Sequence, residues 1–387
     1  MSVKVAHVTL SFERGGRREA ILNLARGLRH LGIESSLVVL DHFGCPDELL
    51  RQNFTESLAL GRSGAWDRSA WRLLNDFCAT HGIDVLHTHD AASLFASAGS
   101  NLGNDRTLLM TFHRSRPLET ATTRDRLRNA LALQRCQAVI TASTERRQHF
   151  VDQNFVSPRK LLTLPLGIDL DRFRFDAASR STLRNEIGCA DGEPIVGAVG
   201  HFGREKGIDL VVDACAELHR RDPDLPFRLV VVGTGNDEDQ RRVREHAAAL
   251  PPGTVHFAGF RDDVHRWFSC FDVFAHGARE EAFGLVIVEA MAAGRPVIAP
   301  RVGGITDIVL DERTGLLCPP EDSHAIAEAL GRLVRDQGLR ERLGQQSCER
   351  AFSEYRLDVY AARHARLYEA LASGRRRFDD WDPDGAS

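Results

Sequence analysis

The stretch REEAFGLVIVEAMAAGRPVIAP, residues 279–300, contains in succession the signals of a charged loop, a helix and a buried strand. An apolar strand is predicted to end near Ala275, Glu281 lies in the loop after it, and a helix begins at about Phe283–Gly284. The run PVIAP (296–300) has the continuous apolar character of a strand buried on both faces. This order of elements predicts a parallel sheet with a crossover helix.

The same alternation extends over most of the chain. Short apolar runs precede helix-like segments in both halves, at residues 4–10, 35–40, 84–87, 107–112, 137–141, 194–200, 228–233, 255–259 and 271–275. A chain of 387 residues is about twice as long as one compact domain needs. The sequence therefore predicts an α/β protein with two Rossmann-like domains, and a ligand in the cleft between them at the carboxyl ends of the strands.

The boundary between the domains is expected near residues 166–190, which read as an irregular linker. Residues 1–170 then form the first domain and residues 171–354 the second. A last helix at about 355–372 is expected to return to the first domain. Residues 373–387 contain too few apolar side chains to pack and are predicted to be disordered.

The composition is that of an ordinary soluble globular protein, with 43% apolar and 27% charged residues. No apolar run approaches the ~20 residues of a membrane-spanning helix, and the N-terminal MSVKVAHVTLSF lacks the pattern of an export signal. The eight cysteines are scattered without a CxxC motif, which favours inert thiols in a reducing cytosol. A cytoplasmic location is expected, either in solution or at the inner face of the membrane.

Charge is distributed unevenly along the chain. The net charge of −4 argues against a nucleic-acid partner, but residues 1–166 carry +5 and residues 167–387 carry −9. The helical segment 124–135 could place Leu127, Leu131 and arginines against an anionic membrane or a lipid-linked phosphate. The alternative is an ordinary surface helix whose apolar side packs inward.

Two glutamates in the opening stretch suit the binding of hydroxyl groups. A spacer of seven residues separates Glu281 from Glu289, so the two carboxylates lie at different depths and can each accept hydrogen bonds from vicinal hydroxyls, as in ribose and other sugars. Gly284 permits close approach to the backbone, and the first N–H groups of the helix can hold an anion. The alternative is that Glu281 caps the helix and Glu289 is simply exposed on it.

Basic and glycine-rich loops provide further candidates for phosphate binding. Gly15 and Gly16 open the first helix directly after the first strand, although a tight turn explains this pair equally well. Arg204 and Lys206 lie in the glycine-bounded loop GHFGREKG (200–207), where they could neutralise a diphosphate or form a solvated basic loop.

Histidines at strand ends are the remaining candidates. His113 follows a strand in the first domain and either faces the cleft or is a satisfied structural residue. His87 and His89 form a His-x-His motif, but no third ligand stands out at a suitable spacing, so no metal site is predicted. VVVGTGND (230–237) begins like a dinucleotide fingerprint, but Glu238 stands where a third glycine is required, which excludes a nicotinamide cofactor.

Taken together, these residues resemble the retaining glycosyltransferases of family 4, which have the GT-B fold of two Rossmann-like domains facing each other across a cleft. The resemblance covers most of the chain, through the segments GGRREAILNLARGLRHLG (15–32), EKGIDLVVDA (205–214), AFGLVIVEAMAAGRPVIAPRVGG (282–304) and TGLL (314–317). Its most specific mark is the Glu281–Glu289 pair. The resemblance implies that the first domain binds the acceptor and the second binds the nucleotide sugar.

The resemblance also implies a role for each candidate residue. His113 and Glu281 would lie at the donor sugar and the reacting centre, and Glu289 would bind the nucleotide ribose. The remaining donor contacts would come from Lys206 and Arg204 on the diphosphate, Gly16 approaching it from the first domain, the backbone of Arg261 at the base, and the backbone of Phe283, Gly284 and Leu285 at the sugar hydroxyls and phosphate.

Some positions depart from the family pattern. His201 stands in place of a usual arginine, His276-Gly277 in place of Pro-Ser, Leu166 in place of an asparagine, and Asp307 in place of a glutamate. None of these changes removes a carboxylate or the lysine, so activity is expected. The change at His201 bears on donor affinity and on donor identity.

The implied reaction is transfer of a hexose-type sugar, most simply from a UDP sugar, with the anomeric configuration retained, to a glycan, lipid-linked or small-molecule acceptor in polysaccharide or glycoconjugate biosynthesis. No cofactor or metal is expected, because Lys206, helix N-termini and backbone donors would stabilise the leaving diphosphate. The alternatives are a catalytically silent GT-B protein that binds nucleotide sugar and activates a partner, and a nucleotide-sugar epimerase. A phosphorylase would need pyridoxal phosphate and a lysine placed to bind it, which the sequence does not offer.

Overall fold

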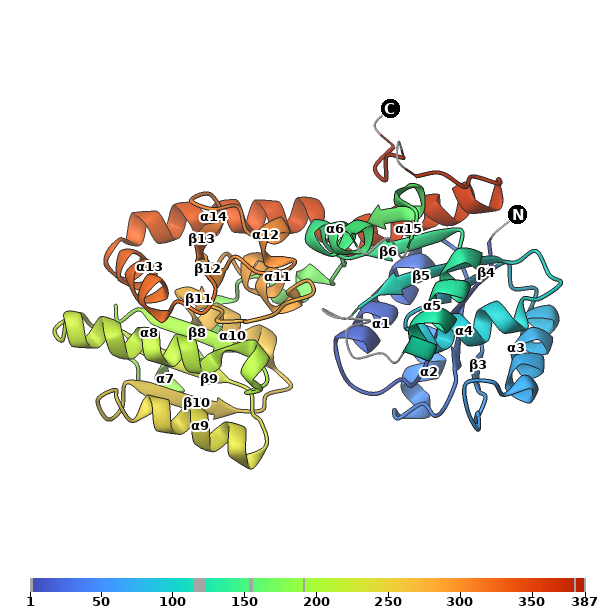
Figure 1. The fold of residues 1–387 in the computed structure, drawn as a ribbon. Helices are drawn as coiled ribbons and strands as arrows, with labels where there is room; N and C mark the ends of the chain where they lie inside the picture. The colour runs from blue at the N-terminus through green and yellow to red at the C-terminus, as the bar shows by residue number, and fades with distance from the viewer. Residues whose placement is uncertain (1–2, 114–122, 153–155, 191, 379–380, 386–387) are drawn as a thin grey trace. The chain divides into compact units, whose positions relative to one another are not determined.

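The chain folds into two units, each built on one parallel β-sheet (Figure 1). The computed structural model describes residues 3–113, 123–152, 156–190, 192–378 and 381–385. One unit comprises Met1–Ile168 together with Leu357–Ser387, and the other comprises Asp169–Arg356. The predicted α/β architecture with two parallel-sheet domains is confirmed.

The sheet of the first unit has the strand order β3-β2-β1-β4-β5-β6-β7. Its strands are β1 (Val5–Thr9), β2 (Ser35–Val39), β3 (Ser57–Ala59), β4 (Val85–Thr88), β5 (Thr107–Phe112), β6 (Ala138–Thr141) and β7 (Leu161–Thr163). The connecting helices are α1 (Gly16–His30), α2 (Asp47–Asn53), α3 (Arg68–His81), α4 (Ala91–Ser100), α5 (Thr123–Arg135) and α6 (Thr144–Asp152). Every residue of β1, β2, β4, β5 and β6 is buried, as in strands covered on both faces, and the buried residues include polar ones such as His7, Ser35 and His87.

The sheet of the second unit has the order β10-β9-β8-β11-β12-β13. Its strands are β8 (Ile195–Val199), β9 (Arg228–Val232), β10 (Val255–Gly259), β11 (Val273–Ala275), β12 (Val297–Pro300) and β13 (Gly315–Cys318). Its helices are α7 (Ala177–Glu186), α8 (Ile208–Arg221), α9 (Asp237–Ala247), α10 (Val264–Cys270), α11 (Leu285–Ala292), α12 (Ile305–Ile308), α13 (Ser323–Arg335) and α14 (Gln337–Glu354). Apolar residues of α8, α9 and α13 pack with β8, β9 and β11 into one core cluster.

The last helix, α15 (Leu357–Ala372), packs against α1 of the first unit. The two helices approach closely, because a Cβ at Gly27 would come 2.6 Å from the Cβ of Ala361. After α15, the chain stays on this unit: Phe378 is buried and its N–H donates to the carbonyl of Arg159 at 2.8 Å. Arg363 also pairs with Asp384 at 2.7 Å. The described part of 373–387 therefore packs, in contrast to the predicted disorder, because one aromatic ring and one ion pair anchor a polar segment.

Two expectations about membranes can be compared with the structure. Among the described residues, no helix has both the length and the apolar character needed to cross a membrane. In α5, the residues that pack inward are Asn129, Ala132 and Leu133, whereas Leu127 and Leu131 are 64% and 56% exposed. The helix therefore packs inward through one apolar side, as the alternative expected, and leaves Leu127 and Leu131 on its exposed side.

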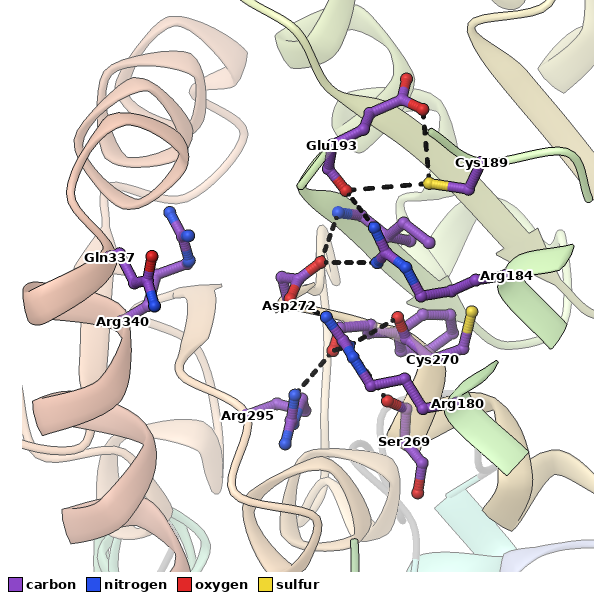
Figure 2. A network of polar contacts seen from close by, with 12 residues as sticks. Arg180, Arg184, Cys189, Glu193, Ser269, Cys270, Asp272, Arg295, Gln337 and Arg340 are labelled. Atoms are coloured by element: carbon purple, nitrogen blue, oxygen red, sulfur yellow. Dashed lines mark hydrogen bonds and ion pairs between the residues drawn. The ribbon is translucent and has the colours of Figure 1, made fainter. Parts of the chain in front are cut away.

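A network around Asp272 fixes the end of the second sheet at which the strands begin (Figure 2). Asp272 accepts hydrogen bonds from Arg180 at 2.7 Å, from Arg184 at 3.1 Å and from the N–H of Ile195, the first residue of β8, at 2.8 Å. Arg180 also donates to the carbonyls of Ser269, Cys270 and Phe271 at the end of α10. These contacts satisfy the carbonyls that a helix leaves without internal partners.

Replacing Asp272 with asparagine is expected to lower the free energy of unfolding by about 2–4 kcal/mol, because two poorly exposed arginines lose their counter-charge. Chemical denaturation measures this change. The matched control is Asp171→Asn, which removes an exposed partner of Arg174 and should cost less than about 1 kcal/mol. Equal losses in the two variants would show that the network adds nothing beyond a surface ion pair.

Candidate functional site

The carboxyl ends of the parallel strands bring the predicted site loops of the second unit to one edge of its sheet. This edge carries the segments 200–207 after β8, 260–263 after β10, 276–284 after β11 and 301–304 after β12. These segments contain Arg204, Lys206, Arg261, Glu281, Phe283 and Gly284. Six of the residues that sequence analysis selected therefore lie along a single edge.

Lys206 and Glu281 form the central contact of this edge. The Nζ of Lys206 lies 2.8 Å from Oε2 of Glu281, and the buried Nε2 of His276 lies 3.4 Å from the same oxygen. Burial alone would raise the pKa of Glu281, but its contacts with His276 and Lys206 outweigh burial and lower this pKa to about 2. Glu281 is therefore an ionised hydrogen-bond acceptor at neutral pH and holds no proton to donate as an acid.

Close backbone packing and one arginine hold the two loops together. A Cβ at Gly207 would lie 1.7 Å from the carbonyl oxygen of Gly277, so the loops after β8 and β11 touch at this point. The guanidinium of Arg279 donates to both carboxylate oxygens of Asp209, at 3.0 and 2.9 Å, and to the carbonyl of Arg204 at 2.7 Å. Arg279 thus links the loop of Glu281 to that of Lys206.

The loop that carries Glu281 also rests on Gly303 and Gly304. The N–H of Gly304 donates to the carbonyl of Glu281 at 3.0 Å. Gly303 has a φ of +52°, and a Cβ there would lie 1.8 Å from this same carbonyl oxygen. A glycine is therefore required at 303 both by backbone conformation and by space.

The start of α11 presents backbone donors beside this loop. Gly284 precedes the helix with a φ of +111°, and its carbonyl accepts from the N–H groups of Ile287 and Val288. The N–H groups of Leu285 and Val286 come before these first helical bonds and lie at the positive end of the helix dipole. The ring of Phe283 is buried against Tyr355, 5.8 Å between centroids. Glu289 lies in the second turn of α11 and is partly buried.

Three residues near this edge differ in what they can offer a ligand. Arg204 is exposed. Arg261 is paired with both carboxylate oxygens of Asp263, at 2.8 and 3.0 Å, so its guanidinium is already neutralised and its backbone is the more available part. The ring Nδ1 of His201 accepts from the N–H of Gly203 at 2.9 Å, and a neutral imidazole in this position offers one N–H donor at Nε2.

In the first unit, Gly15 and Gly16 join β1 to α1. Gly15 has a φ of +152°, and a Cβ at either residue would meet nothing within 4 Å, so the pair leaves open space at the helix start. Asp90, directly after β4, accepts from the N–H of Leu10 at 2.7 Å and pairs with Arg17 at 3.3 Å. It also caps α4.

His113 follows β5 and is bonded to a second histidine. Its Nε2 lies 3.0 Å from Nδ1 of His89. Burial, reinforced by the charge of Arg17, lowers the pKa of His113 to about 3, so its ring is neutral at physiological pH.

The third histidine that the sequence did not reveal is His7 of β1. Ring nitrogens of His7, His87 and His89 lie within 4.8 Å of one another. Both nitrogens of His87 already bond, to the hydroxyl of Tyr368 at 2.8 Å and to that of Thr111 at 2.7 Å. These bonds favour a hydrogen-bonded cluster over a metal site at this position.

Sequence reasoning missed Arg279, Asp209 and Asp90 as positioning groups. The motif HTHD (87–90), at the end of β4, is the local signal that could have pointed to Asp90. Arg279 stands beside Glu280 and Glu281, but its partner Asp209 is 70 positions away, and no local pattern reveals that pairing.

Two family models match the chain in succession. The model described as "Glycosyltransferase Family 4" matches residues 14–172, and the model described as "Glycosyl transferases group 1" matches residues 179–350. These ranges correspond closely to the two units of the fold.

The chain is also similar to individual proteins. The D-inositol 3-phosphate glycosyltransferase of Nocardia farcinica is 32% identical over 225 residues, covering 55% of this chain and 48% of that protein. The matched region spans about half the length of the curated relatives. Anabaena Alr3699/HepE in complex with UDP has a TM-score of 0.83 at 20% identity, with 96% of this chain and 100% of that chain covered. Its complex with UDP-glucose has a TM-score of 0.79 at 21% identity, with 96% and 99% covered.

With one unit matched by the family 4 model and the other by the group 1 glycosyl transferase model, together over most of its length, the chain belongs to the family 4 glycosyltransferases.

Proposed function

We propose that this protein is a retaining, metal-independent glycosyltransferase that moves a hexose-type sugar from a UDP sugar to a phosphorylated or lipid-linked acceptor. The observation that carries this proposal is the contact of Lys206 with the ionised Glu281 beside the first turn of α11. A cation, a carboxylate and backbone N–H groups at one strand edge match the diphosphate and the hydroxyls of a nucleotide sugar.

Each group then has a defined task. Lys206, Arg204 and the N–H groups of Leu285 and Val286 bind the diphosphate and stabilise the negative charge that grows on it as the sugar leaves. Glu281 accepts hydrogen bonds from sugar hydroxyls. Because positive charge develops on the sugar ring in the transition state, an ionised carboxylate at this position also favours bond breaking.

Three further assignments follow the family pattern. Glu289 binds the ribose, and the backbone of Arg261 contacts the base, since its guanidinium is held by Asp263. His113 contacts the donor sugar. The segments 200–207, 276–284 and 301–304 contain no aspartate, and the charge of Lys206 together with the dipole of α11 supplies the electrostatic stabilisation that a metal would otherwise give.

The names of the comparison proteins support the substrates. Anabaena Alr3699/HepE is described in complex with UDP and with UDP-glucose, and the curated relatives are named for D-inositol 3-phosphate. Residues 1–166 of this chain carry a net charge of +5, which suits an anionic acceptor. A phosphorylated polyol is accordingly the first acceptor to test.

The exposed leucines of α5 support a lipid-linked acceptor as the second choice. Leu127 and Leu131 lie one helical turn apart and are largely exposed on a helix that also carries Arg128 and Arg135. Apolar and cationic groups on one surface helix suit the headgroup region of an anionic membrane.

A thermal-shift panel of nucleoside diphosphates and their sugars tests the donor. UDP and one UDP sugar are expected to raise the melting temperature by several degrees at 1 mM, whereas the GDP and ADP counterparts leave it within about 1 °C. Product formed from the selected donor and the acceptors above should carry the donor's anomeric configuration by NMR. An inverted product would overturn the retaining mechanism, and the absence of any shift would overturn the donor assignment.

The position of His201 favours one alternative, a silent protein that binds nucleotide sugar and activates a partner. Its ring is turned onto the N–H of Gly203, so this position brings no fixed positive charge to the diphosphate loop. Donor binding without transfer to any acceptor would favour this alternative. Release of a changed nucleotide sugar in the absence of acceptor would instead indicate an epimerase.

A further inference from the structure

We propose that His7 and His89 are positioning residues that fix His113 as the Nδ1–H tautomer, so that His113 offers a hydrogen-bond donor and no lone pair at Nδ1. The three rings form a hydrogen-bonded chain across adjacent strands of the first sheet. Their role toward a sugar rests on the proposed function, whereas the tautomer itself does not depend on it.

The geometry of the chain is continuous. Nδ1 of His7 lies 3.1 Å from Nε2 of His89, and Nδ1 of His89 lies 3.0 Å from Nε2 of His113. His7 belongs to β1, and His89 and His113 directly follow β4 and β5; these three strands are neighbours in the sheet. The N–H of His89 also donates to the carbonyl of Val8 at 3.0 Å, which fixes the backbone at the centre of the chain.

All three rings are neutral at physiological pH. Burial, with a contribution from neighbouring histidines, lowers the pKa of His7 to about 3 and the pKa of His89 well below its usual value. A neutral imidazole has one N–H donor and one acceptor nitrogen. Each of the two bonds therefore uses a donor on one ring and an acceptor on the next, and the three tautomers are coupled.

The inner end of the chain decides its direction. Nε2 of His7 is buried and has no hydrogen-bond partner among the described residues. A buried N–H without a partner is rarer in folded proteins than an under-satisfied acceptor. The favoured state of His7 therefore leaves its Nε2 unprotonated and places the proton of the ring on Nδ1. His7 then donates to His89, His89 donates to His113, and the proton of His113 must lie on Nδ1.

The consequence for the proposed reaction is specific. A His113 in this tautomer donates from Nδ1 to a sugar oxygen, and it has no lone pair there with which to remove a proton from the acceptor. His113 is therefore assigned to binding and orientation of the donor sugar, and general-base catalysis by its Nδ1 is excluded.

Long-range ¹H–¹⁵N correlation spectra of the ligand-free protein labelled with ¹⁵N-histidine test the assignment at pH 7. The chain has 16 histidines, so signals are assigned from single-histidine variants. The expected result is that Nδ1 is protonated and Nε2 is unprotonated in His7, in His89 and in His113. A protonated Nε2 on His113 would overturn the proposal, whatever the protein's activity.

Two variants of His7 separate positioning from packing. His7→Asp places an ionised carboxylate, which can only accept, near the position of Nδ1; it should turn the chain round, move His113 toward the Nε2–H tautomer and lower kcat roughly tenfold with KM for the acceptor unchanged. His7→Phe keeps a ring but supplies neither donor nor acceptor, so Nε2 of His89 should stay unprotonated and His113 should keep its Nδ1–H tautomer. The matched control is Tyr368→Phe, which removes a partner of His87 outside the chain and should leave the tautomer of His113 unchanged. Stoichiometric zinc in the purified protein would also overturn the proposal, and so would a change in the ¹H–¹⁵N signals of these histidines when a metal chelator is added.

Discussion

Replacing Glu281 with glutamine is expected to slow sugar transfer by roughly 10²–10³-fold while the protein remains folded. The substitution keeps the size of the side chain and one oxygen that can accept from Lys206, which lies 2.8 Å away. It removes the negative charge that, in the proposed mechanism, faces the positive charge developing on the sugar. The loss should therefore fall on kcat for transfer, with the dissociation constant of UDP changed by less than about fivefold.

The pH dependence of the same site gives a second measurement on the wild-type protein. The pKa of Glu281 is lowered to about 2 in the folded state. Since a lowered folded pKa stabilises the protein above the unfolded pKa, this contribution is complete above about pH 5 and is lost only as the pH falls toward 2. Between pH 5 and 8, the rate of transfer should depend on pH in the same way in the wild-type protein and in Glu281→Gln. A titration that is present in the wild type and absent from Glu281→Gln would mean that Glu281 holds a proton in the working enzyme.

The controls separate charge at the site from charge on the surface. Glu312→Gln removes another ionised glutamate, paired with Arg332 at 2.8 Å, from an exposed position and should leave transfer unchanged. Lys206→Met should weaken UDP binding at least tenfold, which Glu281→Gln should not. If Glu281→Gln kept wild-type transfer, or if transfer survived in it only with a partner protein, the silent-protein alternative would gain support.

Much of the fold could be predicted from local sequence because it rests on strands buried on both faces. Continuous apolar runs such as PIVGAVG and RLVVVG are typical of strands covered on both faces of a parallel sheet. These two runs contain β8 and β9. The described end of the chain was harder to predict. The buried ring of Phe378, the ion pair of Arg363 with Asp384 and the bond from Arg366 to the carbonyl of Pro383 help to hold it to the first unit, and a composition average does not detect such contacts.

The candidate site shows the same division. Lys206 and Glu281 could be selected because each follows a strand, and parallel strands deliver such loops to one edge. The groups that orient them could not be selected, because their partners are set by the sheet order. The bond between Arg279 and Asp209 requires β8 to lie beside β11, and the chain of His7, His89 and His113 requires the order β1-β4-β5. Helical spacing left open whether Leu127 and Leu131 point outward, since both faces of α5 contain apolar residues.

Replacing Gly303 with alanine is also expected to slow sugar transfer strongly, because this position requires a glycine. In Gly303→Ala, the new Cβ would lie 1.8 Å from the carbonyl oxygen of Glu281. The loop that carries Glu281 must therefore move by more than an ångström, or the backbone at residue 303 must change its conformation. Either shift breaks the bond from the N–H of Gly304 to the same carbonyl. Since a displacement of about 1 Å at a reacting centre can cost about 10²-fold, transfer should fall by at least this factor.

Gly294→Ala is the matched control, because it separates backbone strain from displacement of the loop. Gly294 also has a positive φ, +72°, but a Cβ there would meet only the carbonyl oxygen of Gly344 at 3.9 Å. In both variants the free energy of unfolding should fall by about 1–2 kcal/mol, because alanine is unfavourable in the left-handed region. Only Gly303→Ala should also lose transfer and the pairing of Glu281 with Lys206. Equal activity in the two variants at temperatures well below their melting points would mean that the position of Glu281 does not limit the reaction.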